Sequence, residues 1–410
     1  MHPTTQPKSH NSIPLYSLFI ANAISLVGNV FSLIAIPWFV LQTTGSATQT
    51  GITGFFTILP VILAGFLAGT LIDRLGYKRT SIIADYASGI TTALIPLLYA
   101  TIGLEFWQLL VLVFLGALLD APGSTARAAL LPELAEQAGM PIERATSLIH
   151  VIERGARLVG APLAGFLIGL MGTANVLWLD AASFVVSAAI IGLMIPAITS
   201  TAEEIKSGKY FEELKDGLRF IVQDRLILSI VVMVMLTNFL DAIFGGVLQP
   251  VYVREVYGRA MDLGLLIAAN GGGAVIGGLI FAAIGHRLPR HATFVGAFVL
   301  TGFRYWVYAL YPPVWVMIIV TLICSIGAGP LNPIIDAIEF ERIPSQMRGR
   351  VFGAITAGAW LAMPLGMLLG GILTDKLGTF IMMIGLAITF LITTLSMAFI
   401  PAMKEMNRKT

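Results

Sequence analysis

Charged side chains stand inside several long apolar stretches of this chain. Asp120, Glu153 and Asp241 are acids in such stretches, and Arg157 and Arg304 are cations. A charged side chain at the centre of a hydrocarbon layer costs about 2.5–3.5 kcal/mol or more, so each group needs a partner, a water-filled cavity or a function. An acid that gains and loses a proton there couples proton movement to another process. Asp120, Glu153 and Asp241 are therefore candidate proton-coupling residues.

Two of these acids have a cation on the same helical face. Glu153 precedes Arg157 by four residues, the spacing at which helical side chains meet. Asp120 precedes Arg127 by seven residues, which is two turns along one face. At 1.5 Å of rise per residue, Asp120 and Glu153 lie roughly 9 Å from the same helix boundary, so a network between helices is geometrically allowed. The spacing predicts either pairs that fix packing or a gating and proton-relay network.

Arg304 is the most deeply placed cation in the second half of the chain, roughly 16 Å from the end of its stretch. It either neutralises Asp241 or holds an anionic substrate. The cost of an unpaired Arg in hydrocarbon favours the pair with Asp241. Asn238 adds a hydrogen-bonding group on the same helix as Asp241. These side chains are candidates for a substrate cavity.

A polar stripe runs along the first apolar stretch. Its members recur at helical spacing, and lipid does not solvate such a stripe whereas a central cavity does. Asn29 lies as deep in the first stretch as Asp241 lies in the seventh, as expected of duplicated halves. The predicted cavity residues are therefore Asn22, Ser25, Asn29, Ser32, Arg157, Asn238, Asp241 and Arg304.

Missing motifs and composition exclude several chemistries. The chain has no Gly-rich loop ending in Gly-Lys-Ser/Thr to cradle ATP, and its 5 His residues are scattered without a His-Glu-x-x-His pair for zinc. Its only cysteine, Cys324, lies in an apolar run. The net charge of +2 leaves no broad basic surface for nucleic acid. We predict no enzyme activity, no cofactor, no metal and no nucleic-acid partner.

The stretches that carry these residues are long enough to cross a membrane. Hydrophobic residues make up 57% of the chain and charged residues 12%, about half the charged share of soluble domains. A bilayer core about 30 Å thick takes roughly 20 apolar residues to cross as a helix. We expect an all-α membrane protein with twelve transmembrane helices in two six-helix halves. The expected spans are residues 13–41, 49–72, 80–101, 106–131, 147–170, 174–198, 225–252, 263–284, 293–311, 314–339, 351–373 and 380–403.

Positive charge is distributed unevenly between alternate loops. Most of the 25 Lys and Arg residues fall in the loops of one side, whereas the other side holds only Arg254, Arg259 and Lys376. Lys and Arg concentrate in cytoplasmic loops, so both termini are expected in the cytoplasm. The N-terminal residues lack the basic start and cleavage site of a signal peptide.

The longest polar stretch, residues 199–224, separates six expected spans from six. We interpret it as a cytoplasmic linker with a short amphipathic helix at 210–222, between an N-terminal half (1–198) and a C-terminal half (225–410). Pro162-Leu163 precedes Gly172-Thr173 as Pro364-Leu365 precedes Gly378-Thr379, which indicates an internal duplication. Proteins built from such repeats bind their substrates between the halves, near the midplane.

The loop after the second span carries Gly69-Thr-Leu-Ile-Asp73-Arg74-Leu-Gly76-Tyr-Lys78-Arg79. This segment resembles the loop signature of the major facilitator superfamily, which implies the fold of those transporters. By that resemblance, Gly69 permits close helix packing, Gly76 permits a tight turn, and Asp73 with Arg74 and Arg79 forms a cytoplasmic charge latch. The other interpretation is that a basic loop only fixes topology.

Further segments narrow the resemblance. They are Ala129-Leu-Leu-Pro-Glu-Leu, Leu179-Asp180-Ala-Ala-Ser-Phe, Asn238-Phe-Leu and Arg348-Gly349-Arg350-Val351-Phe352. These segments are similar to the bacterial branch that contains macrolide-efflux and enterobactin-exporter proteins. In the fifth span, Gly160-Ala161-Pro162-Leu-Ala-Gly165 resembles the Gly-Pro motif of exporters, whose small residues let helices approach. Ala161 separates Gly from Pro here, a departure from that pattern.

The resemblance implies a secondary active transporter of the bacterial inner membrane that exports amphiphilic small molecules such as drugs or siderophores. Its partners would be that substrate, membrane lipids and protons, and the chain is expected to be a monomer. One alternative is a flippase that moves lipid or lysolipid between leaflets. An alternative of another class is a membrane receptor or scaffold that binds without transport.

Overall fold

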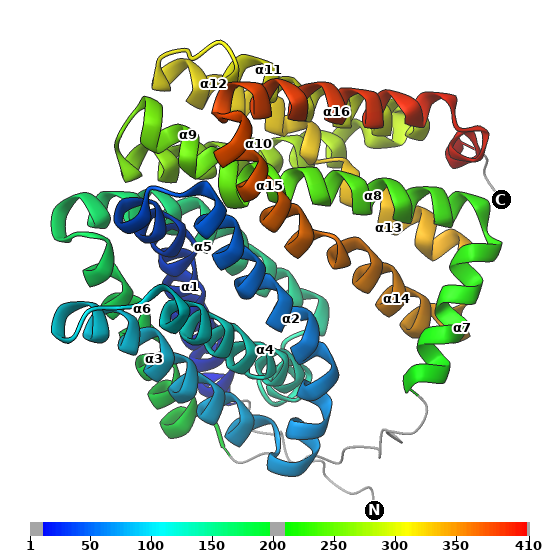
Figure 1. The fold of residues 1–410 in the computed structure, drawn as a ribbon. Helices are drawn as coiled ribbons and strands as arrows, with labels where there is room; N and C mark the ends of the chain where they lie inside the picture. The colour runs from blue at the N-terminus through cyan, green and yellow to red at the C-terminus, as the bar shows by residue number, and fades with distance from the viewer. Residues whose placement is uncertain (1–10, 197–209, 408–410) are drawn as a thin grey trace, which may run out of the picture. The chain divides into compact units, whose positions relative to one another are not determined.

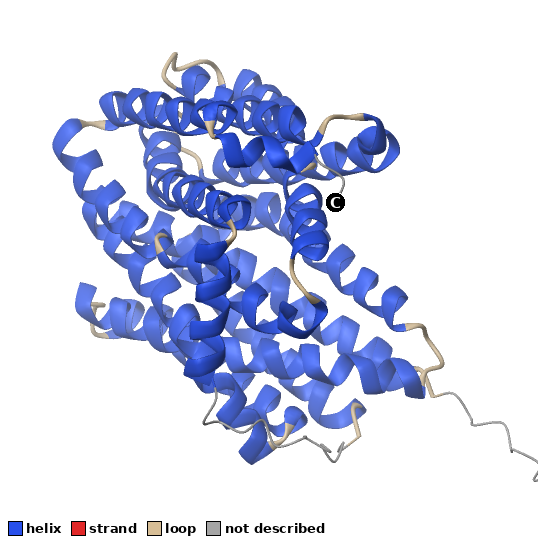
Figure 2. Ribbon diagram, turned by 90° about the vertical axis from the view of Figure 1, so that its right-hand side faces the viewer, coloured by secondary structure: helices blue, strands red, loops and turns tan. Residues whose placement is uncertain are grey.

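The computed structural model describes residues 11–196 and 210–407, and within them the side chains of all residues except 65–70, 73 and 210–214. Every regular element in this described part is a helix, joined by short loops (Figure 2). The first six long helices are α1 (Ile13–Thr44), α2 (Ala47–Leu75), α3 (Tyr77–Thr101), α4 (Phe106–Gln137), α5 (Ile142–Met171) and α6 (Thr173–Met194) (Figure 1).

The second part of the chain begins with α7 (Tyr210–Gln223), at the position of the amphipathic helix expected within the linker. Several of the following spans are interrupted rather than continuous. They comprise α8 (Arg225–Ile243), the π-helical turn η1 (Phe244–Leu248), α9 (Gln249–Val256), α10 (Ala260–Ile284), α11 (Arg290–Tyr308), α12 (Val314–Ser325), the 3-10 turn η3 (Ile326–Ala328), α13 (Leu331–Arg342), α14 (Arg348–Leu361), α15 (Met363–Leu377) and α16 (Thr379–Phe399). Three more 3-10 turns are η2 (Gly285–Arg287), η4 (Ser345–Met347) and η5 (Pro401–Asn407).

Within the described residues, 11 helical segments are long and apolar enough to cross a membrane. The one expected span missing from these 11 is the ninth, residues 293–311, which overlaps α11, a helix of 19 residues. It falls outside the 11 because Arg290, His291, Arg304 and several hydroxyl-bearing side chains lower its mean hydropathy. The helical architecture expected from the sequence is therefore present, and its least apolar member carries one of the predicted functional cations.

Large apolar side chains cover much of the outside of these helices. Leu193 and Phe399, for example, are 84% and 80% exposed. A water-soluble protein rarely exposes extended apolar surface of this kind, because its burial is the main driving force of folding. The exposed apolar surface is the one expected to contact lipid.

The chain divides into two compact units that cut across the helices. Unit 1 comprises residues 1–32, 63–160 and 177–204, and unit 2 comprises residues 33–62, 161–176 and 205–410. The core of unit 1 is formed by α1, α4, α5 and α6, with fully buried residues such as Leu18, Leu134 and Ile191. In unit 2, Leu41 and Ala47 pack with Val247 and Val251, and Met367 lies against them.

Candidate functional site

The first cluster of charged groups lies inside unit 1, around Arg127 on α4. Arg127 Nη1 lies 2.5 Å from Asp85 Oδ1 of α3, and the two side chains are only 4% and 0% exposed. Ser187 of α6 donates a hydrogen bond of 2.7 Å to the other Asp85 oxygen. A carboxylate so deeply buried needs both a cation and hydrogen bonds to offset its lost hydration.

Asp120 is the second acid of this cluster. Its Oδ1 lies 3.8 Å from Arg127 Nη2, so the predicted pair across two turns of α4 is present as a longer contact. Asn29 of α1 donates a hydrogen bond of 3.2 Å to Asp120 Oδ2. Asp120 Oδ1 is buried and accepts no hydrogen bond from the described part of the chain. Asp120 is therefore less completely neutralised than Asp85.

Asp180 on α6 is the third acid, and its side chain is almost fully buried. Ser32 of α1 donates a hydrogen bond to it, and Ser183 Oγ approaches it from within α6 at 3.4 Å. A side chain at Gly28 would come within 2.5 Å of Asp180 Oδ1, so α1 must approach this carboxylate with a glycine. Asp120 and Asp180 bind side chains of the same helix, Asn29 and Ser32 of α1.

Together, Asp85, Asp120, Asp180 and Arg127 form what we call the Arg127 cluster. It contains three carboxyl groups and one guanidinium, so Arg127 cannot balance all three acids in their ionised forms. From the sequence, Asp120 was predicted as a proton-coupling residue, whereas Asp85 and Asp180 were not. Both are acids within expected spans, 80–101 and 174–198, so the criterion applied to Asp120 selects them as well.

Glu153 and Arg157 do not join this cluster. Both are exposed, and Glu153 pairs instead with His150 at 3.2 Å. No ion pair links Glu153 to Arg157 in the part of the chain that the structure describes. The spacing of four residues does place them on one face of α5, but that face is the exposed one, so the expected neutralisation is absent.

The polar stripe of α1 lies against the helices of unit 1. Asn22 and Ser25 are buried, whereas Asn29 and Ser32 are half-buried and bind carboxyl groups on α4 and α6. Asn29 and Ser32 lie about one turn apart on α1, so this helix links Asp120 to Asp180.

The second cluster lies in unit 2 and joins α8 to α11. Arg304 Nη2 donates hydrogen bonds of 3.0 Å to Asp241 Oδ1 and 3.1 Å to the Tyr305 hydroxyl. The Tyr305 hydroxyl in turn donates to Asp241. The Asp241 side chain is 39% exposed, whereas that of Arg304 is 6% exposed. The structure thus brings Asp241 and Arg304 together, with the acid as the accessible member of the pair.

Aromatic rings surround the buried side of this pair. The Arg304 guanidinium lies 5.3 Å from the ring centroid of Phe244 and 5.0 Å from that of Tyr305, distances at which cation–π attraction operates. Phe244 begins the π-helical turn η1, and such turns often occur at functional sites. The ring of Phe244 also packs edge-on against Tyr305 and Tyr308. The sequence did not reveal the role of Tyr305, because its contact depends on how α11 packs against α8.

Asn238, predicted to act beside Asp241, is used differently. Its Nδ2 donates a hydrogen bond of 3.0 Å to the Ala359 carbonyl of α14, which ties α8 to α14. Farther along the same span, Gln249 donates a hydrogen bond of 2.9 Å to the Tyr308 hydroxyl.

The segment of the predicted latch is not a loop: it forms the end of α2, the single connecting residue Gly76 and the start of α3. The burial of Gly69 and the side chain of Asp73 lie outside what the structure describes, whereas Arg74 and Arg79 are exposed. Lys78 donates hydrogen bonds of 2.9 Å and 2.5 Å to the carbonyls of Gly192 and Ile195, at the end of α6. Cations favour helix C-termini, so Lys78 fastens α3 to α6 within unit 1.

Gly76 adopts φ 78° and ψ 159°, a conformation that is essentially restricted to glycine. We expect Gly76→Val to destabilise the protein by about 1–3 kcal/mol through backbone strain. Thermal unfolding of the purified protein in detergent measures this. Gly155→Val on α5 is the matched control, because a Cβ placed there has no atom of a neighbouring element within 4 Å. Equal unfolding temperatures for the two variants would contradict the strain argument.

Small residues of α5 permit close packing in both units. In unit 1, a side chain at Gly160 would contact Val30 of α1 at 3.2 Å. In unit 2, a Cβ at Gly165 would lie 2.6 Å from the Ala260 carbonyl at the start of α10, and one at Gly264 would lie 2.2 Å from the Ala161 carbonyl. Pro162 lies within α5 between these contacts. The motif therefore brings the α5 and α10 backbones together, as small residues do in membrane helices.

No group of His, Cys, Asp and Glu side chains in the described residues is arranged to hold a metal ion. The chemistry available at the two clusters is binding of charge, protons and aromatic surface.

Sequence and structural comparisons identify the relatives of the chain. A sequence profile described as transmembrane secretion effector matches residues 10–410. The multidrug efflux pump Tap of Mycobacterium tuberculosis is 32% identical over 409 residues, covering 98% of this chain and 96% of that protein. Macrolide efflux protein A of Streptococcus pyogenes is 18% identical over 369 residues, covering 89% and 90% of the two chains.

Solved structures show the same fold at low sequence identity. The nucleoside transporter NupG superimposes with a TM-score of 0.74 at 12% identity, covering 94% of this chain and 98% of that one. A bacterial homologue of the iron transporter ferroportin gives a TM-score of 0.68 at 16% identity, with coverage of 94% and 98%. With the profile match over nearly the whole length, these findings show that the chain belongs to the transmembrane secretion effector family of major facilitator transporters and is a multi-pass membrane efflux transporter rather than an enzyme.

Proposed function

We propose that this transporter exports amphiphilic small molecules, drugs among them, from the cytoplasm or the inner leaflet in exchange for protons. The observation that carries the proposal is the Asp241–Arg304–Tyr305 cluster beside aromatic rings. It offers an accessible carboxylate next to apolar and aromatic surface, which suits a molecule with a polar group on an apolar body. Full-length similarity to a protein named as a multidrug efflux pump supports the same substrate class.

The Arg127 cluster supplies a place for the exchanged proton. Its three carboxyl groups face one guanidinium, so binding a proton is the direct way to balance a buried acid that Arg127 does not reach. Among the predicted coupling acids, Asp120 belongs to this cluster and Asp241 to the other. Glu153 is exposed beside His150 and is the weakest candidate. The proposal assigns proton binding to Asp120 together with Asp180.

The transport cycle proposed here is alternating access by the six-helix halves 1–198 and 225–410, joined by the linker 199–224, with both termini in the cytoplasm. The remaining cavity candidates are Asn22, Ser25, Asn29, Ser32 and Arg157. Asn238, bound to a backbone carbonyl, has a positioning role instead. We expect the chain to act as a monomer in a bacterial cytoplasmic membrane.

Counterflow in proteoliposomes with an imposed pH gradient tests the proposal. We expect uptake of a fluorescent cationic drug to increase when the gradient drives protons in the opposite direction. Asp180→Asn should remove the response to the gradient, whereas Glu133→Gln, an exposed acid on α4, should retain it. Drug transport that ignores the gradient in every variant would reject proton coupling. Movement of a fluorescent lipid without any drug flux would replace export by lipid flipping.

A further inference from the structure

The chain contains a second copy of the motif that ends α2. Residues 371–378 read Gly371-Ile-Leu-Thr-Asp375-Lys376-Leu-Gly378, and residues 69–76 read Gly69-Thr-Leu-Ile-Asp73-Arg74-Leu-Gly76. The glycines, the leucines and the aspartate coincide, and a basic residue follows the aspartate in both. The first copy ends the second expected span, and the second copy ends the eleventh. Because an odd number of spans separates them, the two copies lie on opposite sides of the membrane.

Both copies form the same turn. Gly76 has φ 78° and ψ 159°, and Gly378 has φ 82° and ψ 158°. The Gly76 N–H donates to the Ile72 carbonyl at 2.7 Å, and the Gly378 N–H donates to the Thr374 carbonyl at 2.9 Å. Each glycine immediately precedes the next helix, α3 or α16. The similarity is therefore structural as well as sequential.

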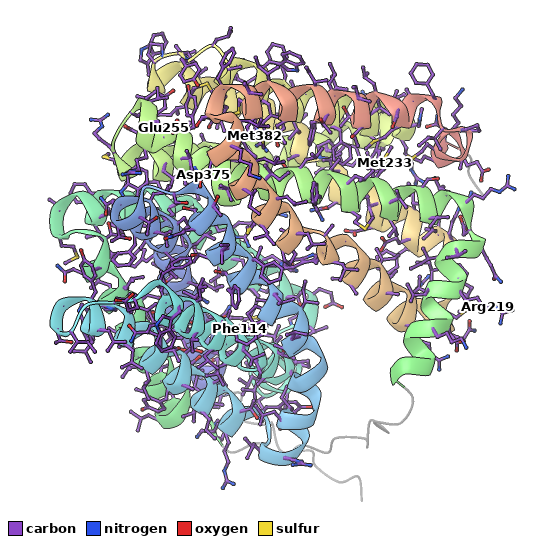
Figure 3. All side chains as sticks on the ribbon, in the orientation of Figure 1. Phe114, Arg219, Met233, Glu255, Asp375 and Met382 are labelled. Atoms are coloured by element: carbon purple, nitrogen blue, oxygen red, sulfur yellow. The ribbon has the colours of Figure 1, made fainter. Side chains whose placement is uncertain are left out.

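In the second copy the aspartate is engaged. Asp375 accepts hydrogen bonds from Ser46 Oγ at 2.7 Å, from the Ala47 N–H at 2.9 Å and from the Thr48 N–H at 2.8 Å. Those N–H groups open α2, so the carboxylate caps the positive end of a helix that is more than 300 residues distant in the chain. Figure 3 labels Asp375 near the end of α15. Both segments belong to unit 2.

Glycines bring the two helices together beside this cap. A Cβ at Gly371 would lie 2.5 Å from the Ala47 carbonyl and 3.0 Å from Gly51 Cα. A Cβ at Gly51 would lie 2.4 Å from the Met367 carbonyl. The backbones of α2 and α15 thus touch without intervening side chains, a contact that forms and separates without repacking large groups.

The equivalent contact in unit 2, between α5 and α10, has no carboxylate at the position of Asp375. The alignment of Gly172-Thr173 with Gly378-Thr379 places Gly169 of α5 at the position of Asp375. Gly165 of α5 approaches the start of α10 as Gly371 approaches the start of α2, yet a Cβ placed at Gly169 has no atom of a neighbouring element within 4 Å. Close packing therefore needs only the glycines, and the carboxylate on α15 requires a separate explanation.

We propose that Asp375 is the latch of the outer gate: it holds the outer ends of α2 and α15 together and must release α2 each time the outer side opens. The first copy, with Asp73, would serve the cytoplasmic side in the opposite phase of the cycle. This inference rests on the proposed alternating-access transport, because only such a cycle requires the contact to break and re-form.

A reversible cross-link tests whether the contact must open. Ser46→Cys with Asp375→Cys, in a Cys324→Ser background, places one thiol near the Ser46 Oγ position and the other near the carboxyl carbon of Asp375, whose Oδ2 now lies 2.7 Å from that Oγ. We expect oxidation to form a disulfide and stop transport, and reduction to restore it. A pair that does not cross-link would contradict the contact, and a cross-linked chain that transports at the full rate would overturn the latch.

A labelling experiment separates the latch from the identity of the substrate. Thr53 is 2% exposed and lies beyond Thr48 on α2, so labelling of Thr53→Cys by an impermeant thiol reagent added outside reports opening. Asp375→Asn, which removes the charge-assisted caps, should raise the labelling rate by roughly tenfold. Gly371→Leu should raise it as well, because its side chain would push α15 away from the Ala47 carbonyl. Asp262→Asn is the matched control, because its partner Arg259 is only three residues away. Unchanged labelling in both variants would overturn the latch even if drug export is observed, and altered labelling without drug export would reject only the proposed substrate.

Discussion

Replacing Arg127 with leucine is expected to destabilise the protein by about 3–5 kcal/mol, because it leaves the Asp85 carboxylate buried without its cation. Arg127 and Asp85 are 4% and 0% exposed and lie 2.5 Å apart, so water cannot take the place of the guanidinium. The change also removes the contact to Asp120. Thermal and denaturant unfolding of the purified protein in detergent micelles measures the loss.

The double variant Arg127→Leu with Asp85→Asn separates the loss of the ion pair from the cost of leaving the Asp85 carboxylate buried and unpaired. Replacing both partners of a buried pair is usually far less costly than removing one, so the double variant should recover most of the stability. Arg144→Leu, an exposed cation near the start of α5, serves as the control and should unfold like the unmodified protein. If Arg127→Leu alone also unfolds at the same temperature as the unmodified protein, the charge-balance argument for the Arg127 cluster fails.

Replacing Arg304 with glutamine is expected to lower drug transport by roughly tenfold or more, the effect of losing hydrogen bonds between charged groups worth about 1.5–3 kcal/mol. Stability should fall less than in Arg127→Leu. Asp241 is 39% exposed and keeps the Tyr305 hydroxyl, so its carboxylate remains solvated when Arg304 is gone. Initial rates in proteoliposomes, compared with unfolding temperatures, measure the two effects separately.

Tyr305→Phe provides the finer test of this cluster. It retains the aromatic ring beside Arg304 and removes only the hydroxyl that donates to Asp241. We expect a smaller loss of transport than in Arg304→Gln, and the double variant should be no worse than Arg304→Gln alone if the groups act together. Full transport in Arg304→Gln would show that the pair is structural and that the substrate binds elsewhere.

The Arg127–Asp85 and Arg304–Asp241 ion pairs look alike in the sequence but differ in their exposure to water. Each joins an acid and an arginine within apolar helices, yet both partners are buried in the Arg127–Asp85 pair, whereas Asp241 remains accessible in the other. Accessibility is what lets a charged group meet a substrate that enters from water. The contrast assigns stability mainly to the first pair and transport mainly to the second.

The sequence by itself determined the class of the protein and the location of its helices. Three local properties were sufficient: the length of the apolar stretches, the distribution of Lys and Arg, and the glycine at position 76. They are sufficient because a helix in lipid satisfies its own backbone hydrogen bonds whatever its neighbours are. The cost of an unpaired charge also predicted that Arg304 lies beside Asp241, as it does. The ninth span was expected from its length even though Arg304 and its tyrosines make it less apolar than the other 11.

Only the tertiary structure decided which faces of these helices meet. Spacing along α5 suggested a Glu153–Arg157 pair, but that face is exposed and Glu153 binds His150. Asp85 and Asp180 belong to the Arg127 cluster because α3 and α6 pack beside α4 and α1. Asp375 binds the first N–H group of α2, although the two residues are 328 positions apart in the chain. Contacts between residues so distant depend on the packing of whole helices, which local spacing does not encode.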